Sequence, residues 1–228
     1  MSDLTIRDIP SPNCGERRGG VVPDMVVIHY TAMESAAAAC ARLCSQEHEV
    51  SAHYLVDITG EIIRLVPEDL RAWHAGAGAW GDVTDVNSRS IGIELANRGA
   101  EPFAAAQMDA LELLLADLLT RHRIAPERVI GHQDMAPARK SDPGPRFDWR
   151  RLSLSGLAVW PEAGEADPSG FFDDLTAFGY PQADDPARLA AFRARFRPRR
   201  EGSVDRIDAG LAHDLAARFP VDPTPANA

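Results

Sequence analysis

Short apolar runs and stretches of helical periodicity alternate along the first two thirds of the chain. The runs at 26–29, 91–95 and 129–131 are typical of buried strands, because each is short and rich in valine and isoleucine. The segment 51–66, with a Thr-Gly turn near its centre, predicts a β-hairpin. Glycine and alanine dominate the segment 73–90, which predicts a long loop of the kind that often carries function.

Helical spacing predicts two helices in the same part of the chain. Between 104 and 123, leucines recur three and four positions apart with acidic residues between them, as in a helix that packs one face on a sheet. An alanine-rich helix of about a dozen residues is predicted after the strand at 26–29. Strands and helices in this order predict an α/β fold, a mixed central β-sheet flanked by helices.

The composition changes after position 160, where Glu, Gly, Asp and Pro accumulate in a predicted linker at 162–168. This linker divides the chain into a larger domain, 1–160, and a small C-terminal three-helix module, 168–228. The module's helices are predicted at 171–178, 186–196 and 205–218. Its predicted core consists of Leu175, Leu189, Phe192, Phe196 and Leu211.

Five arginines lie close together in the module: Arg193, Arg195, Arg197, Arg199 and Arg200. Ten acidic residues offset eight basic ones from Asp167 onward, so a phosphate site is disfavoured. We interpret the arginines as a solvated charged face.

The overall charge and the cysteines limit the partners and the compartment. A net charge of -10 disfavours nucleic acid, because a polyphosphate would be repelled. No apolar run approaches the roughly 18 residues of a membrane helix, and the start shows no signal sequence. Cys14, Cys40 and Cys44 are too few for a disulfide scaffold. We predict a cytoplasmic protein without an integral membrane segment, or a periplasmic or outer-membrane-associated one if a leader was removed. The oligomeric state is left open.

Two histidines differ in context from the other five. His29 ends one predicted strand and His132 follows another, which puts both imidazoles at the rim of a sheet, where clefts form. Asp142 lies ten residues after His132 in a Pro/Gly-rich segment. Two imidazoles and a carboxylate suit Zn²⁺ and leave a fourth tetrahedral position open for water or substrate. Spacing alone makes this signal weak, because His29 is distant in the chain.

Glu94 and Lys140 are candidate catalytic residues beside such a site. Glu94 interrupts an apolar strand, so it faces either solvent or a cleft; next to zinc it would be the natural general base. Lys140 lies two residues before Asp142 in an extended segment, so both point to the same side. There it would place a positive charge where an oxyanion develops. The alternative for Lys140 is an ordinary exposed lysine.

These residues lie in motifs that closely resemble the zinc N-acetylmuramoyl-L-alanine amidases of type 2, which share the fold of the peptidoglycan recognition proteins. The resemblance runs from about residue 8 to 150. In chain order the motifs are IHYTA at 28–32, SAHY at 51–54, RAWHAG at 71–76, IGIEL at 91–95 and GHQDMAPARKSDPGP at 131–145. The segment 171–219 resembles the helical peptidoglycan-binding module of the AmiD type, whereas the AmpD type lacks an added module.

The resemblance implies hydrolysis of the amide between the lactyl group of N-acetylmuramic acid and L-alanine. The substrates would be muropeptides, anhydro and ordinary, in cell-wall turnover or recycling. The matching positions make His29, His132 and Asp142 the ligands of one Zn²⁺ per chain, Glu94 the catalytic acidic residue and Lys140 the lysine that assists the transition state.

The roles of three further residues and one alternative function stay open. Trp73 and His74 are expected to line the substrate groove, with structural packing as the alternative, and His53 is expected to be structural. Non-catalytic members of this fold bind peptidoglycan without cutting it and commonly lack part of the metal set. The complete set in this chain therefore favours an enzyme over such a binding protein.

Overall fold

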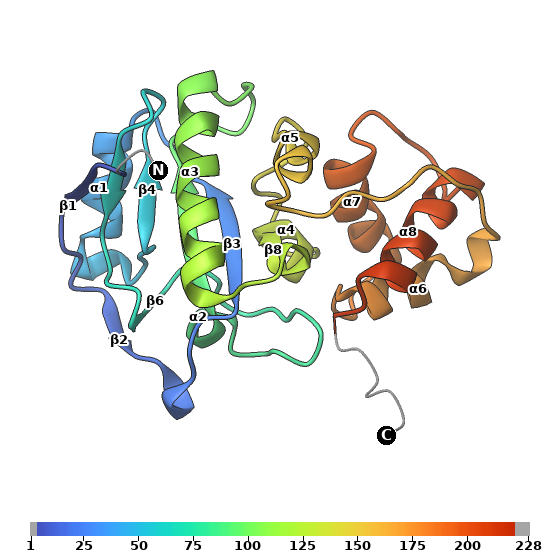
Figure 1. Ribbon diagram of the computed structural model, residues 1–228, viewed down its shortest axis with the longest axis horizontal. Coiled ribbons are helices and arrows are strands. Elements are labelled where there is room, and N and C mark those ends of the chain that lie inside the picture. Colours follow the sequence, from blue (N-terminus) through green and yellow to red (C-terminus); the bar gives the residue numbers. More distant parts are fainter. Residues whose placement is uncertain (1–3, 222–228) are drawn as a thin grey trace.

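A six-stranded mixed sheet forms the centre of the computed structural model (Figure 1). The structure describes residues 4–221; positions 1–3 and 222–228, into which both predicted domains extend, lie outside the described residues. In spatial order the sheet contains β1 (Ile6–Asp8), β5 (Ile62–Arg64), β4 (Tyr54–Val56), β7 (Ser90–Leu95), β3 (Met25–Tyr30) and β8 (Val129–Gly131). A separate antiparallel pair consists of β2 (Cys14–Glu16) and β6 (Leu70–Ala72).

Helices cover the sheet and continue the chain beyond it. They are α1 (Ala36–Leu43), α2 (Val86–Arg89), α3 (Ala105–His122), α4 (His132–Met135), α5 (Trp149–Leu154), α6 (Phe171–Phe178), α7 (Asp185–Phe196) and α8 (Arg206–Arg218). This arrangement confirms the predicted α/β class with a mixed sheet flanked by helices. None of the helices within residues 4–221 combines the length and apolarity needed to cross a membrane.

The strands β4, β7, β3 and β8 run parallel, and β5 returns antiparallel to β4 as the predicted hairpin. In the pairing of β3 with β7, His29 lies opposite Glu94. His132 follows the end of β8, the neighbour of β3 on its other side. The carboxyl ends of these three strands meet at one edge, which is where parallel sheets commonly bind ligands.

The two faces of the sheet pack against different helices because successive strand residues point to opposite sides. Val26 and Ile28 of β3 pack against α3 through leucines that include Leu111 and Leu114. On the other face, Val27 joins a cluster formed with the C-terminal helices. Helix α1 covers the far end of that second face, over β4 and β5. His29 is two residues after Val27 and therefore points to this second face, between α1 and the C-terminal helices.

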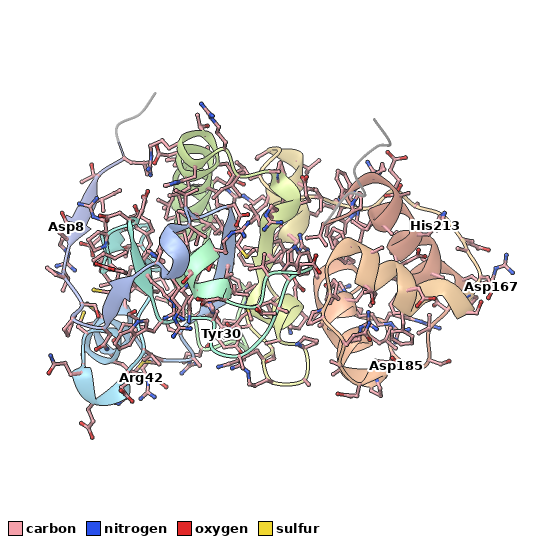
Figure 2. All side chains as sticks on the ribbon, turned by 90° about the horizontal axis from the view of Figure 1, so that it is seen from below. Asp8, Tyr30, Arg42, Asp167, Asp185 and His213 are labelled. Atoms are coloured by element: carbon pink, nitrogen blue, oxygen red, sulfur yellow. The ribbon has the colours of Figure 1, made fainter. Side chains whose placement is uncertain are left out.

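The three C-terminal helices begin and end within one residue of their predicted bounds. Phe171, Phe178 and Phe192 share one apolar cluster with Ile130 and Met135 at the end of the sheet. Side chains of the sheet region and of the C-terminal helices fill the space between these two parts of the chain (Figure 2). The segment 161–167 contains neither helix nor strand, in keeping with the predicted linker. Whether 1–160 and 168–228 are separate domains stays a prediction.

The interpretation of the arginine cluster as a solvated face is wrong for several of its members. The Arg193 and Arg195 side chains are buried and pair with Asp208 and Asp134. Arg197 pairs with Asp205 as well as Asp208. The number of acidic and basic residues gives the net charge of the segment. It does not show which side chains the folded helices bury.

Two local predictions need correction as well. The alanine-rich helix α1 has 8 residues rather than a dozen and is capped by the Ser35 hydroxyl, which accepts from the Ala38 amide. The predicted loop 73–90 contains the short helix α2 at its end.

Candidate metal centre

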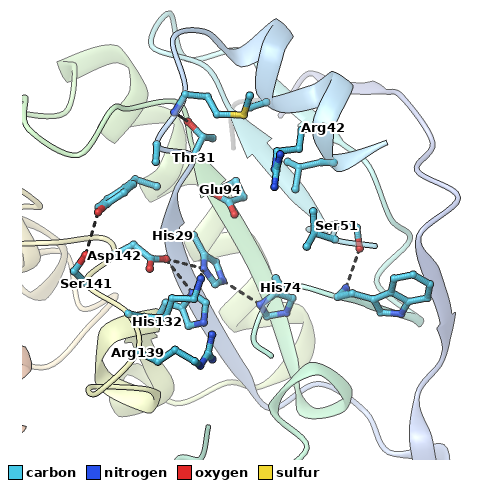
Figure 3. A pocket seen from close by; sticks show the side chains of 18 residues that line it. His29, Thr31, Arg42, Ser51, His74, Glu94, His132, Arg139, Ser141 and Asp142 are labelled. Carbon is cyan, nitrogen blue, oxygen red and sulfur yellow. Dashed lines mark hydrogen bonds and ion pairs between the residues drawn. The ribbon is translucent and has the colours of Figure 1, made fainter. Parts of the chain in front are cut away.

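Three side chains from distant parts of the chain converge at the edge of the sheet (Figure 3). The Nδ1 atoms of His29 and His132 lie 2.9 Å apart. Oδ2 of Asp142 lies 2.9 Å from Nδ1 of His29 and 3.1 Å from Nδ1 of His132. All three residues are buried. The structure therefore brings together the three ligands that the sequence predicts.

The geometry of this trio fits a small tetrahedral ion. Ligand atoms bound to Zn²⁺ at about 2.0–2.1 Å are separated by roughly 3.3 Å, close to the spacing of the three atoms. Imidazole nitrogen and carboxylate oxygen are both ligands that Zn²⁺ accepts, and three protein ligands leave one position open. Among the described residues 4–221, no other group of three or more His, Cys, Asp or Glu side chains has a spacing that would hold a metal ion.

Hydrogen bonds on the far side of each imidazole fix its orientation. Nε2 of His132 donates to the carbonyl oxygen of Ala75 at 2.8 Å, which leaves Nδ1 unprotonated toward the site. Nε2 of His29 donates to Nδ1 of His74 at 3.0 Å. His74 in turn places Nε2 3.2 Å from the Ser90 hydroxyl, which donates to the backbone. Nδ1 of His29 and Nδ1 of His132 thus carry free lone pairs.

The protonation states suit metal binding. Burial, together with the neighbouring His132, lowers the pKa of His29 to about 4, so its ring is neutral at pH 7. Burial alone would raise the pKa of Asp142, yet the adjacent imidazoles of His132 and His29 bring it well below its usual range. A neutral imidazole and an ionised carboxylate are the forms that coordinate metals.

Glu94 lies on β7, directly opposite His29 in the parallel register. Its Oε2 atom is buried and has no hydrogen-bond partner among the described residues. Burial, and next the negative charge of Asp142, raise the pKa of Glu94 to about 8, while Lys140 acts in the opposite direction. The charge of a divalent cation held by His29, His132 and Asp142 would oppose this rise and favour the ionised form of Glu94. The free oxygen of that carboxylate is positioned to exchange a proton with a group bound beside it.

A pocket of about 390 Å³ surrounds these groups. Its walls include Tyr30, Arg42, Trp73, His74 and Lys140. Both ring nitrogens of His74 form hydrogen bonds within the protein, one with His29 and the other with Ser90. These contacts indicate that His74 orients the ring of His29.

His53 lies outside the pocket lining. It is buried, and Nδ1 accepts from the Gly92 amide while Nε2 lies 3.1 Å from the Arg17 guanidinium. These contacts are structural, as expected from the sequence.

Two cationic residues of the pocket were not predicted. Arg139 lines it and donates to the carbonyl oxygens of Ala75 and Ala77. In an extended segment the neighbour of Lys140 would point to the opposite side, so the alternation that groups Lys140 with Asp142 does not identify Arg139. Arg42 extends from α1 toward the same pocket (Figure 3), and nothing in the alanine-rich sequence around it indicates this placement.

Comparisons with known proteins agree with this geometry. AmiD from Escherichia coli is 36% identical over 87% of this chain and 84% of its own length. AmpD from the same organism is 33% identical over 65% of this chain and 90% of its own.

A solved structure of E. coli AmiD with anhydro-N-acetylmuramic acid-L-Ala-D-γ-Glu-L-Lys superposes with a TM-score of 0.80 at 32% identity, covering 92% of this chain and 99% of that one. The family model for N-acetylmuramoyl-L-alanine amidase matches residues 19–145, a segment that includes all three converging side chains, Glu94 and Lys140. This chain therefore belongs to the N-acetylmuramoyl-L-alanine amidase family and is of the AmiD/AmpD-like kind.

Proposed function

We propose that this chain is a zinc-dependent amidase that cleaves the bond between the lactyl carbonyl of N-acetylmuramic acid and L-alanine in muropeptides. The observation that carries the proposal is the convergence of Nδ1 of His29, Nδ1 of His132 and Oδ2 of Asp142 within 3.1 Å of one another. The same pocket contains the unpaired Glu94 oxygen. The solved AmiD structure, whose ligand contains this bond, supports the choice of substrate.

His29, His132 and Asp142 would hold Zn²⁺, which would supply a Lewis acid that polarises the scissile carbonyl and makes the attacking water more acidic. Glu94 is placed to take the proton of the attacking water at Oε2 and to pass it to the L-alanine nitrogen. One C–O bond forms and the C–N bond breaks, so the products are a lactyl carboxylic acid and a free stem peptide. Lys140 is placed to stabilise the negative charge on the carbonyl oxygen.

The rest of the pocket suits an amphipathic, anionic ligand. Trp73 offers an aromatic face for a sugar ring. Arg42 and Arg139 add positive charge to a site in an otherwise acidic protein, which suits the carboxylates of a stem peptide. This distribution supports a muropeptide over a neutral acyl amide.

Mass spectrometry of the products tests the proposal. Metal-free protein, zinc-restored protein and the zinc-restored Glu94→Gln variant are each incubated with anhydro-N-acetylmuramyl tripeptide and with the ordinary, reducing-end form. We expect free tripeptide only from the zinc-restored unmodified chain. If the muropeptide stays intact in that sample, the remaining interpretation is a non-catalytic protein of the same fold that binds muropeptides.

The two substrates also separate the branches of the family. Cleavage of both would support the broad, AmiD-like specificity that the C-terminal helices favour, and cleavage of the anhydro form alone would support the AmpD type. The cytoplasmic location, with a periplasmic or outer-membrane-associated one as the alternative, stays a prediction from the sequence.

A further inference from the structure

We propose that Arg195 of the C-terminal helices, through Asp134, is a positioning residue that holds helix α4 and thereby the metal ligand His132. The inference rests on the proposed function, because it treats His132 as a ligand of Zn²⁺. It assigns the C-terminal helices a role inside the metal centre.

The carboxylate of Asp134 links the backbone just before His132 to the side chain of Arg195. Its Oδ2 accepts a hydrogen bond from the Gly131 amide at 2.8 Å and another from Nη1 of Arg195 at 2.8 Å. Its Oδ1 accepts from the Tyr180 hydroxyl at 2.8 Å. Gly131 is bonded directly to His132, so the position of this carboxylate sets the start of α4.

The pair is completely enclosed. The side chains of Arg195 and Asp134 are both 0% exposed. The Arg195 guanidinium also donates to the Val129 carbonyl oxygen at 3.2 Å and lies 4.0 Å from the ring centre of Trp149. Breaking a buried ion pair from one side leaves an uncompensated charge, which is strongly unfavourable. Without Arg195, Asp134 can reach a counter-charge or water only by moving, and α4 would move with it.

The same helix contacts the other ligand segment. The Gln133 amide donates to the carbonyl oxygen of Asp142 at 2.8 Å, so α4 also holds the backbone of the third ligand. On its opposite side, the Gln133 side chain donates to the carbonyl oxygen of Ala191 on α7 at 3.4 Å. Helix α4 therefore lies between α7 and the metal centre and transmits the position of one to the other.

The loop that leads from the pocket is held by the same part of the chain. The ring of Trp80 packs against Phe178 and Tyr180, and the Gly81 amide donates to the carbonyl oxygen of Gly179 at 2.9 Å. A Cβ on Gly179 would come within 2.5 Å of the Trp80 ring, so a glycine is required for this approach. Tyr180 thus contacts both the loop and Asp134.

Helix α7 itself provides a matched control. Arg193, two positions before Arg195, forms a buried pair with Asp208 of α8. It also donates to the carbonyl oxygens of Gly202 and Ser203. All of these partners belong to the C-terminal part and lie outside α4. The two arginines therefore share residue type, helix and burial but differ in whether the metal centre depends on them.

Zinc affinity of the full-length chain, measured by competition with a chromophoric chelator, tests the inference. We expect Arg195→Met to bind Zn²⁺ 10- to 100-fold more weakly, the range for loss of groups that orient metal ligands. Arg193→Met should bind within about twofold of the unmodified chain, although both variants melt earlier. Equal zinc affinities for the two variants would overturn the inference.

Two further variants keep the test decisive if Arg195→Met does not fold. Tyr180→Phe removes one hydrogen bond to Asp134 and should weaken zinc binding by a smaller factor. In Asp134→Asn/Arg195→Met, the buried charge is gone while the amide oxygen can still accept from Gly131, so zinc binding should return to within about threefold of normal. Normal affinity in Tyr180→Phe together with weak binding in the double variant would refute the assignment. If the unmodified chain binds no Zn²⁺, the proposed function fails instead.

Discussion

The imidazole of His74 lies directly over Gly92, in the space that a side chain on this strand residue would occupy. A Cβ on Gly92 would come within 2.4 Å of Cγ of His74 and 2.7 Å of its Nδ1. That Nδ1 is the atom that accepts the hydrogen bond from His29. The glycine in β7 is therefore required by His74, the residue that orients His29 on the neighbouring strand.

Gly92→Ala should consequently weaken metal binding without touching a ligand. The new methyl group displaces the His74 ring, His29 loses the acceptor of its Nε2 proton, and zinc affinity falls by about 10-fold or more. Gly15→Ala is the control, because Gly15 also lies in a strand and a Cβ there would meet no described atom within 4 Å beyond its chain neighbours. Isothermal titration with Zn²⁺ measures both. Unchanged affinity in Gly92→Ala would contradict the role given to His74.

Glu94→Gln should separate metal binding from turnover. The amide keeps the size of the side chain but cannot accept the proton, so kcat should fall by about 10²- to 10⁴-fold. Zinc affinity should be retained, because Glu94 is not one of the three converging ligands. Initial rates with zinc-loaded protein, alongside zinc content by atomic absorption, test this. Near-normal turnover would exclude Glu94 as the base.

Lys140 should affect the rate through its charge. Replacing it by methionine removes the cation from the pocket while keeping an aliphatic chain, and kcat should decrease by about 10²- to 10³-fold with little change in zinc content. Lys140→Arg keeps the positive charge and should recover part of the loss. If the methionine and arginine variants are equally slow, the shape of the side chain rather than its charge matters.

The sequence predicts the centre of the fold because its buried strands are continuous apolar runs. β3, β7 and β8 are such runs, and His29 and Glu94 could be placed on them. The strands β1, β2 and β6 have three residues each and no alternating pattern, so local signals were too weak to reveal them. The family motifs, and not the spacing of His29, His132 and Asp142, predict that these three side chains meet.

The environment of a charged side chain was harder to predict. Arg195 looks like any surface arginine in the sequence, since its partner Asp134 lies 61 positions away and belongs to a different part of the fold. The pocket position of Arg42 likewise depends on how α1 packs over β4 and β5. Both are consequences of tertiary packing, which hydrophobic periodicity alone does not encode.

Acid sensitivity of the fold should depend on Glu68, a residue remote from the metal centre. Its carboxylate pairs with Arg121 and His122 and accepts from the Tyr54 hydroxyl. Burial opposes ionisation, yet these hydrogen bonds, that of Arg121 foremost, lower the pKa of Glu68 to about 2. Because the folded pKa lies below the ordinary value near 4.5, the stabilisation is complete above that value and disappears as the pH falls toward 2.

Glu68→Gln should therefore lower the free energy of unfolding by roughly 2 kcal/mol at pH 7 and flatten the loss of stability between pH 4.5 and 2. Asp8→Asn serves as the control, since Asp8 also pairs with an arginine, Arg64, but both side chains are largely exposed. Exposed pairs contribute little, so this variant should follow the pH profile of the unmodified chain. Urea titrations at pH 7, 4.5 and 3 compare the three proteins. Parallel pH profiles for Glu68→Gln and the unmodified chain would mean that another carboxylate controls the acid transition.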